Sequence, residues 1–353
     1  MDVLYEFVPY GERFDPRPAT IVLDVGMRTV PGVIDHHHPD AEPECTASLI
    51  VKYPGLVLDH LAPYSGPGPE RDLPPLRIIT HRLPDFDSLA SIFLTLKLLE
   101  NGTIDSSMGQ IARYTRLVDS ASLPAEIELS STPYAILRAL FAGARKEEEE
   151  INRIRVAEGL KFMHFLHSKA EEGYRIDENR LLYSGIDRYQ RAGRKVENDY
   201  FHYLDDLEGA EKLALNLPLS AGTGSRRVDG LIVRNPMSFL LKEWARRDRK
   251  HSSLAKGFSL LVTNFGGHRY ILGVDPARGV YLRGLGGRLN QAERQKREEG
   301  GRDFPHPWYE GNCPFFNYRI IDSPQDGTIL SHEEIIRCLL AFSRESAQPD
   351  GRT

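Results

Sequence analysis

A repeated order of strand, polar turn and helix limits the folds open to the first part of this chain. Short apolar runs rich in β-branched residues occur at 20–25 (TIVLDV), 32–34 (GVI) and 76–80 (LRIIT). Helical patterns follow in CTASLIVK and in SLASIFLTLKLLENG, and the second ends at Asn101 and Gly102, residues that commonly close a helix. Strands that alternate with helices in this way are typical of an α/β domain built on a parallel sheet.

The length predicts more than one domain. A chain of 353 residues with 41% hydrophobic residues can bury a core in each of two domains. We expect a parallel-sheet domain at 1–143, a long connecting helix in the charged segment 144–178, a smaller mixed α/β domain at 179–345 and a disordered tail at 346–353. The mixed character is predicted from DGLIVRN, FLLKEWARR, GFSLLVTNF and HRYILGVDP, which alternate strand-like and helix-like patterns.

Charge and cysteine content restrict the compartment and the partners. A formal charge of −5 argues against nucleic-acid binding through overall charge, although it allows a locally basic groove. Cys45, Cys313 and Cys338 are too few and too widely spaced for a disulfide framework or a thiolate zinc site, so a reducing compartment is expected. The N-terminus has no signal-peptide pattern and no apolar stretch is long enough to cross a bilayer. We therefore expect a cytoplasmic protein without a membrane partner.

Acids and histidines gather where the predicted strands end. These residues are Asp24, Asp35, His36, His37, His38, His81, Asp85 and Asp87. The carboxyl ends of parallel strands share one edge of a sheet, where ligands bind. Carboxylates with imidazoles and without a thiolate suit Mn²⁺ or Mg²⁺. Two such ions about 3.5 to 4 Å apart activate water, polarise a phosphoryl group and neutralise charge on the leaving oxygen.

Each motif also has a purely structural interpretation. Asp-His pairs cap helices, a histidine tract can be a surface feature, and HxxxDxD can be a turn that an Asp side chain stabilises. The combination with a third acid that ends its own strand is harder to explain structurally, because clustered carboxylates destabilise a fold unless cations are present. The sequence therefore favours a metal site.

The motifs THRLPDFDSLAS, VLDVG, VIDHHHPD and TASLI resemble those of the DHH phosphoesterase superfamily. That family includes RecJ-like exonucleases, oligoribonucleases, exopolyphosphatases and family II inorganic pyrophosphatases. A further segment, IARYTRLVDSAS, resembles the family's later acid-bearing helix, so the likeness covers about the first 125 residues. The family places HxxxDxD before DHH, whereas DHH comes first here. A circular permutation within the sheet would preserve the site in space.

The resemblance implies two Mn²⁺ ions, or Mg²⁺, and a ligand set for each. His81 and Asp85 would hold one ion. His36 and Asp87 would hold the other. Asp24 would bridge the two ions.

Four further residues receive roles from the same resemblance. Asp119 would complete the shell of the second metal. Asp35 would orient a metal-bound imidazole, as such imidazoles usually require, and His37 would face the scissile phosphate. His38 would be a neighbour that contacts substrate.

The second half would correspond to the family's substrate-binding (DHHA1-like) domain. In RGLGGRLN, Gly286 and Gly287 would allow close backbone approach to phosphate, and Arg283 and Arg288 could pair with it. His306 could also contact phosphate. The alternative is a pair of hairpin turns with solvated arginines, and for NFGGH we favour the hairpin.

The leading hypothesis is a Mn²⁺-dependent phosphoesterase that acts on a nucleotide or a short oligonucleotide. An inorganic pyrophosphatase or polyphosphatase is the second possibility. A module that senses a nucleotide without hydrolysing it is the third. The expected partner is a phosphorylated small molecule or short nucleic acid, and a homo-oligomer or protein complex is possible.

Overall fold

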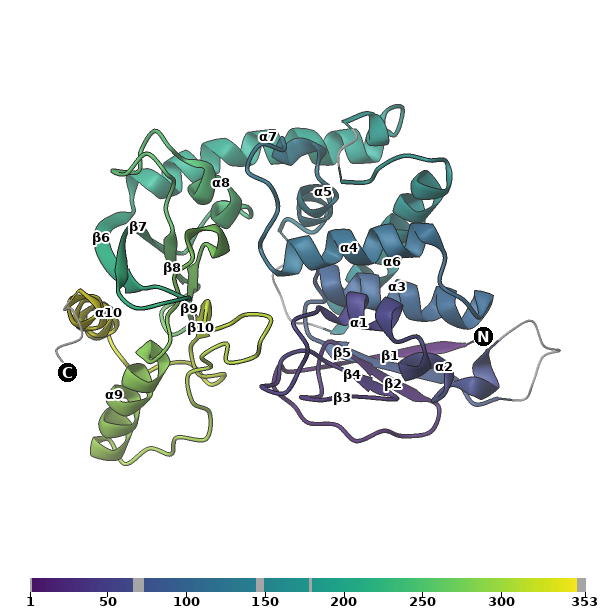
Figure 1. Cartoon of the computed structure of the whole chain (residues 1–353), viewed down its shortest axis with the longest axis horizontal. Helices are drawn as coiled ribbons and strands as arrows, with labels where there is room; N and C mark the ends of the chain where they lie inside the picture. The colour runs from purple at the N-terminus through teal and green to yellow at the C-terminus, as the bar shows by residue number, and fades with distance from the viewer. Residues whose placement is uncertain (1, 66–72, 144–148, 178–179, 348–353) are drawn as a thin grey trace. The chain divides into compact units, whose positions relative to one another are not determined.

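The computed structural model describes residues 2–65, 73–143, 149–177 and 180–347. Within these ranges the chain forms ten α-helices and two five-stranded mixed sheets, which confirms the α/β fold class (Figure 1). The chain divides into two compact units. The first comprises Met1–Val196 with Cys313–Phe315, and the second comprises Glu197–Asn312 with Phe316–Thr353.

The first sheet has the strand order β1-β5-β2-β4-β3. Four strands are parallel to one another: β1 (Val3–Val8), β5 (Leu76–His81), β2 (Thr20–Leu23) and β4 (Val33–Ile34). The last strand, β3 (Thr29–Val30), runs antiparallel to β4, because a tight turn joins the two. The sheet is therefore mixed, where the sequence predicted a parallel one. The expected strands at 20–25, 32–34 and 76–80 are confirmed.

Helices cover one face of this sheet (Figure 1). The first unit contains α1 (Thr46–Lys52), α2 (Gly55–Leu58), α3 (Phe86–Asn101), α4 (Ser106–Asp119), α5 (Pro133–Leu140) and α6 (Glu149–Glu171). The central helix, α3, contacts β2, β5, α1, α4 and α6, and Gly102 ends it in the left-handed conformation, as the sequence predicted. A smaller apolar cluster covers the other face and consists of Val8, Val22, Val25, Val33 and Ile79 with Phe14 and Val30 at its margin.

Helix α6 lies inside the segment expected to connect the domains, yet it belongs to the first unit. It packs on α3 and α4, and a Cβ at Gly159 would come within 2.6 Å of Leu89, so this glycine allows a close helix contact. The division between units falls instead inside α7 (Asp187–Glu208). Residues 144–148 and 178 of the expected connecting helix lie outside the described residues.

The second sheet has the order β10-β9-β8-β7-β6, in which only β7 and β8 are parallel. Its strands are β6 (Glu211–Pro218), β7 (Ser225–Arg234), β8 (Leu260–Asn264), β9 (Tyr270–Val274) and β10 (Ile320–Asp322). The NFGGH segment joins β8 to the antiparallel β9, which confirms the hairpin.

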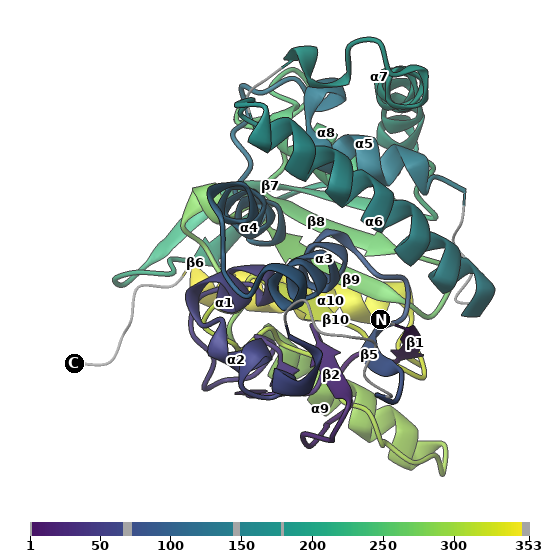
Figure 2. The ribbon, with the colours of Figure 1, turned by 90° about the vertical axis from the view of Figure 1, so that its right-hand side faces the viewer.

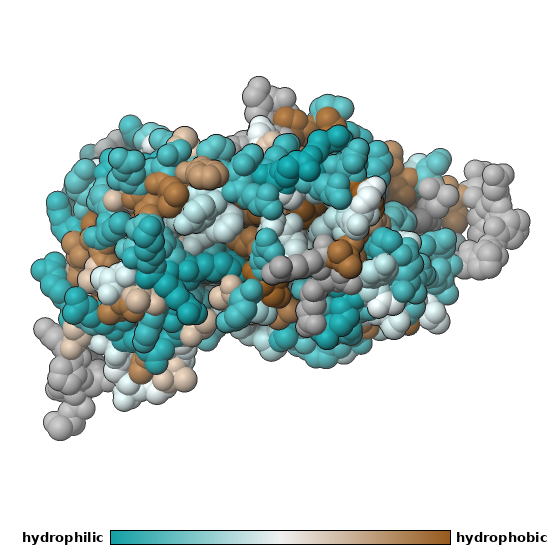
Figure 3. Space-filling view, turned by 90° about the horizontal axis from the view of Figure 1, so that it is seen from above, coloured by the Kyte–Doolittle hydropathy of each residue, from teal (hydrophilic) through white to brown (hydrophobic). Residues whose placement is uncertain are grey.

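Helices lie on both faces of the second sheet (Figure 2). One apolar cluster joins the strands to α9 (Leu285–Glu299) and α10 (His332–Ser346), and another joins them to α7 and α8 (Leu241–Arg247). Residues 348–353 of the expected tail lie outside the described residues. None of the helices in the described ranges combines the length and apolarity needed to span a bilayer. The face drawn in Figure 3 is mostly hydrophilic, with apolar side chains in small groups.

Candidate metal centre

Carboxylates and imidazoles of the first unit converge at the carboxyl edge of its sheet. Asp24 follows β2, the DHH residues follow β4, and His81 ends β5. Among the described residues, three groups place ligand atoms within 4.8 Å of one another: Asp24, Asp35, His36 and His37; Asp24, His81 and Asp85; and His36, Asp87 and Asp119. All six predicted metal ligands and both predicted catalytic residues are thus brought together. Buried clusters of this kind could hold metal ions.

Asp24 lies between the groups and is almost completely buried. Its Oδ2 is 3.3 Å from Nε2 of His81, and its Oδ1 is 3.7 Å from Nδ1 of His36. The two oxygens of one carboxylate therefore face different histidines. The backbone of Asp24 is left-handed, with φ of 63°, which is uncommon for a non-glycine residue and is concentrated at functional positions.

Two hydroxyl groups that the sequence did not single out hold Asp24 in place. Ser88 Oγ donates to Asp24 Oδ2 at 2.8 Å and lies 2.5 Å from His81 Nε2. Thr46 Oγ1 donates to Asp24 Oδ1 at 3.1 Å and lies 3.2 Å from His36 Nδ1. Both follow recognised motifs directly, in PDFDS and TASLI, which is a signal that could have identified them.

The third group, His36 with Asp87 and Asp119, surrounds His36, whose side chain is fully buried. Nδ1 of His36 is 3.7 Å from Asp87 Oδ2, and Nε2 is 3.3 Å from Asp119 Oδ2. Asp87 also accepts hydrogen bonds from the backbone N–H groups of Thr46, at 2.8 Å, and Ala47, at 2.9 Å. It therefore stabilises the N-terminus of α1 in addition to facing the histidine.

Asp35, which was expected to orient a metal-bound imidazole, pairs instead with His37, the residue expected to face the phosphate. Asp35 Oδ1 is 2.7 Å from His37 Nδ1, and the Met27 backbone N–H donates to Asp35 Oδ2 at 2.6 Å. Burial opposes ionisation of Asp35, but the charge and hydrogen bond of His37 outweigh it and hold the pKa of this carboxyl well below its usual range. Nε2 of His38 lies 3.1 Å from Thr29 Oγ1, and His38 belongs to none of the three groups.

The second group includes His81, which contacts an aromatic ring that the sequence did not single out. Nδ1 of His81 donates to the backbone carbonyl of Arg82 at 2.8 Å, which leaves Nε2 directed at Asp24 and Ser88. The Tyr10 ring stacks on His81 with 4.1 Å between centroids, and its hydroxyl is 3.1 Å from Nε2. Tyr10 is 48% exposed, so it borders the site on the solvent side.

The histidines differ in charge because their neighbours differ. Burial and the charge of His37 lower the pKa of His36 to about 3, so its imidazole is neutral. Burial also disfavours charge on His81, but hydrogen bonds with Asp24 and Asp85 raise its pKa to about 10. A metal ion binds the neutral imidazole, so it would have to displace a proton from His81 but not from His36.

The carboxylates repel one another. Burial, together with the charges of Asp24 and Asp119, raises the pKa of Asp87 well above its ordinary value. Divalent cations would relieve that repulsion, because they supply the opposite charge inside the cluster. The donor set of imidazole nitrogens and carboxylate oxygens fits Mn²⁺ or Mg²⁺. The nearby thiol of Cys45 is buried, burial raises its pKa, and it belongs to none of the three groups.

The predicted glycine-rich loop of the second unit forms the first turn of α9. Gly284 precedes the helix, and Gly286 and Gly287 lie within it. The Glu310 carboxylate accepts hydrogen bonds from the N–H groups of Gly284 and, at 3.2 Å, of Gly286. A Cβ at Gly286 would come within 2.8 Å of Glu310. An acid of the chain thus occupies the helix N-terminus where a phosphate was expected.

The other predicted substrate contacts of the second unit also have partners within it. Arg288 pairs with Glu345, and the Arg283 guanidinium lies 5.0 Å from the centre of the Tyr318 ring. His306 is exposed. Among the described residues, none of the three belongs to the groups of candidate metal ligands. The alternative of a hairpin turn with solvated arginines is also wrong for RGLGGRLN, because this segment begins α9 and Arg288 pairs with Glu345.

Comparison of the chain with protein-family models, with curated proteins and with solved structures finds no match. Function is therefore inferred from the geometry and chemistry of the site.

Proposed function

We propose that this protein is a Mn²⁺-dependent phosphoesterase with a DHH-like site whose motifs occur in permuted order. The observation that carries the proposal is the position of Asp24, whose two carboxylate oxygens face His81 and His36 separately. A carboxylate placed in this way could contribute one oxygen to each of two cations. Parallel strands β2, β4 and β5 bring the motifs to one edge although their order along the chain differs from the family's.

The donor set divides naturally between two ions. His81 and Asp85 would hold one, because their ligand atoms are 3.8 Å apart and both lie near Asp24. His36, Asp87 and Asp119 would hold the other ion, because one ligand atom of each lies within 4.8 Å of the other two. When bound, two divalent ions activate water and stabilise the negative charge that develops on a phosphoryl group.

The chain's own residues would supply orientation and proton handling. His37 is partly exposed, is held by Asp35 and lies 3.8 Å from Asp24. Burial disfavours a charged imidazole, but Asp35 raises the pKa of His37 well above its usual value, so His37 is charged at neutral pH. A cationic imidazole at the solvent side of the cluster can pair with a phosphoryl oxygen or give a proton to a leaving oxygen. The Tyr10 hydroxyl can donate a further hydrogen bond.

A nucleotide or short oligonucleotide phosphodiester is the proposed substrate class. Its support is a tyrosine ring at the exposed border of the site, since aromatic rings stack on nucleobases. Pyrophosphate offers nothing for that ring to contact. A second candidate function, metal-dependent sensing without hydrolysis, is favoured by Asp87, because both of its oxygens already bond the N-terminus of α1.

The test is a substrate panel on metal-stripped protein reloaded with Mn²⁺. p-Nitrophenyl-thymidine phosphate, a dinucleotide and pyrophosphate are compared for wild type, Asp24→Asn and Asp119→Asn. Asp40→Asn is the matched control, because Asp40 is an exposed carboxylate just beyond the DHH motif.

We expect turnover of the two phosphodiesters, a loss of about 100-fold or more in the two site variants and no change in the control. Preferential turnover of pyrophosphate would transfer the proposal to the pyrophosphatase class. Tight Mn²⁺ and nucleotide binding without turnover would favour the sensing function, and equal activity in all variants would contradict both.

A further inference from the structure

Strand β1 forms one edge of the first sheet and pairs only with β5 among the described residues. The pairing is parallel and regular over six residues, from Val3 opposite Leu76 to Val8 opposite His81. In a parallel ladder, alternate residues of a strand direct both backbone groups to the same neighbour. The other residues direct theirs away from it.

The register of β1 on β5 shows which residues face outward. The carbonyls of Asp2 and Val8 accept hydrogen bonds from β5, so the even-numbered residues of β1 face that strand. The outward residues are therefore Val3, Tyr5 and Phe7. Each presents one N–H and one C=O, so the edge offers six groups, and no hydrogen bond to another described segment engages them.

Within the described residues, this edge strand has no proline, lysine or bulge that would protect it against pairing. Natural edge strands carry proline, lysine or a bulge, or are very short. The sequence VLYEFV contains neither proline nor lysine, and its register with β5 has no bulge. Glu6 is its one charged residue, and it pairs with Arg77 at 3.6 Å on the neighbouring strand.

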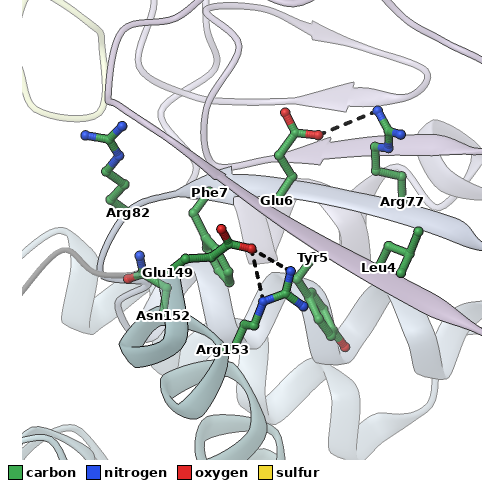
Figure 4. Close-up of a pocket in the computed structure, with 9 residues that line it drawn as sticks. All are labelled: Leu4, Tyr5, Glu6, Phe7, Arg77, Arg82, Glu149, Asn152 and Arg153. Atoms are coloured by element: carbon green, nitrogen blue, oxygen red, sulfur yellow. Dashed lines mark hydrogen bonds and ion pairs between the residues drawn. The ribbon is translucent and has the colours of Figure 1, made fainter.

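A groove of about 440 Å³ runs along the strand (Figure 4). Its walls are four residues of β1, two arginines at β5 and the start of α6. Four of its five charged residues form oppositely charged pairs, Glu6 with Arg77 at 3.6 Å and Glu149 with Arg153 at 2.6 Å. The fifth, Arg82, adds a positive charge at the end of β5. A surface of alternating sign is complementary to a second copy of itself, because rotation places each sign near its opposite.

We propose that β1 pairs antiparallel with β1 of a second copy of this chain, about a two-fold axis at Tyr5. Tyr5 then lies opposite Tyr5 of the second copy, and Val3 lies opposite Phe7. Each of these three pairs exchanges two hydrogen bonds, so all six outward groups are satisfied. The half-buried apolar side chains of these residues become cross-strand neighbours on one face. The first sheet of one copy and the first sheet of the other then join into one sheet of ten strands.

The inference is independent of the proposed function and is tested on the full chain. Sedimentation velocity over a range of concentrations should show a monomer–dimer equilibrium for wild type. Tyr5→Pro should raise the dimer dissociation constant at least tenfold, since it removes an outward N–H and leaves the bonds to β5 intact. Leu4→Ser is the matched control, because Leu4 is exposed and its backbone faces β5, and it should dimerise within about threefold of wild type.

A charge pair tests the position of the axis and does not depend on proline. Tyr5→Lys and Tyr5→Glu should each be monomeric, since like charges would meet across the axis, whereas a mixture of the two should form a heterodimer. Circular dichroism checks that each variant is folded. A wild type that stays monomeric at all concentrations, Tyr5 variants that dimerise like wild type, or a mixture that fails to associate would each overturn the proposal.

Discussion

Asp87→Ala should destabilise the metal-free protein at the N-terminus of α1. The substitution leaves two backbone donors, Thr46 N–H and Ala47 N–H, without their acceptor. Each buried donor left unsatisfied costs about 1–3 kcal/mol, so opening of α1 should become easier by about 2–6 kcal/mol. At 1.4 kcal/mol per factor of ten, amide exchange in α1 should accelerate by about 30-fold to about 10,000-fold.

The assay is hydrogen exchange with mass spectrometry on protein kept metal-free with chelator, because it reads α1 separately from the rest of the chain. Asp85→Ala is the comparison, since Asp85 caps α3 through one bond, from Ser88 N–H at 3.1 Å, worth about 0.5–2 kcal/mol. Asp87→Asn keeps one carbonyl acceptor and should lie between Asp87→Ala and wild type. Exchange in α1 that is unchanged by Asp87→Ala would refute the reasoning.

Three further outcomes follow from the structure. Mn²⁺ affinity measured by calorimetry should rise with pH between 6 and 9, because His81, with a pKa of about 10, must lose its proton to bind the ion. The rise should be about tenfold per pH unit for each proton displaced. A flat profile would contradict this. Glu310→Ala should accelerate exchange at the start of α9 by the loss of about 1–3 kcal/mol, without creating a phosphate site that calorimetry can detect. Gly26→Ala should lower stability by more than about 1 kcal/mol in thermal melts, because φ is 121° and the new Cβ would lie 2.5 Å from Val33.

Much of the first unit could be predicted from local patterns. The strands that end at Asp24, at the DHH motif and at His81 were recognisable because buried parallel strands are short, apolar and β-branched. The helix after PDFDS was recognisable by its periodicity and by Gly102. The first strand, VLYEFV, was not predicted, although it carries the alternating pattern that a half-exposed strand produces.

The site was predicted better than its surroundings. Most of the clustered acids and histidines could be predicted from residue type and strand ends, which are local properties of the sequence. Asp119, which ends α4, was assigned only through the family resemblance. The acceptor role of Asp87 toward α1 could not be predicted, because it depends on a contact between residues 41 positions apart. The same holds for Glu310, which reaches Gly284 across 26 positions and replaces the expected phosphate at α9. Tertiary partners of this kind are not encoded in motif spacing.

The extent of the first unit was also beyond local reasoning. A charged helix such as α6 is compatible with a solvent-exposed connector, and its buried face is revealed only by what it packs against. Gly159 against Leu89 marks that face, but a single glycine in a helix has several structural explanations.

Electron paramagnetic resonance of protein titrated with Mn²⁺ tests most directly whether two ions share one centre in the first unit. We expect two ions per chain that are exchange-coupled in wild type, because the Asp24 carboxylate would join them. The coupling should be lost in Asp24→Asn. A single bound ion, or two ions whose spectra are uncoupled and unaffected by Asp24→Asn, would contradict a shared centre at the edge of the first sheet.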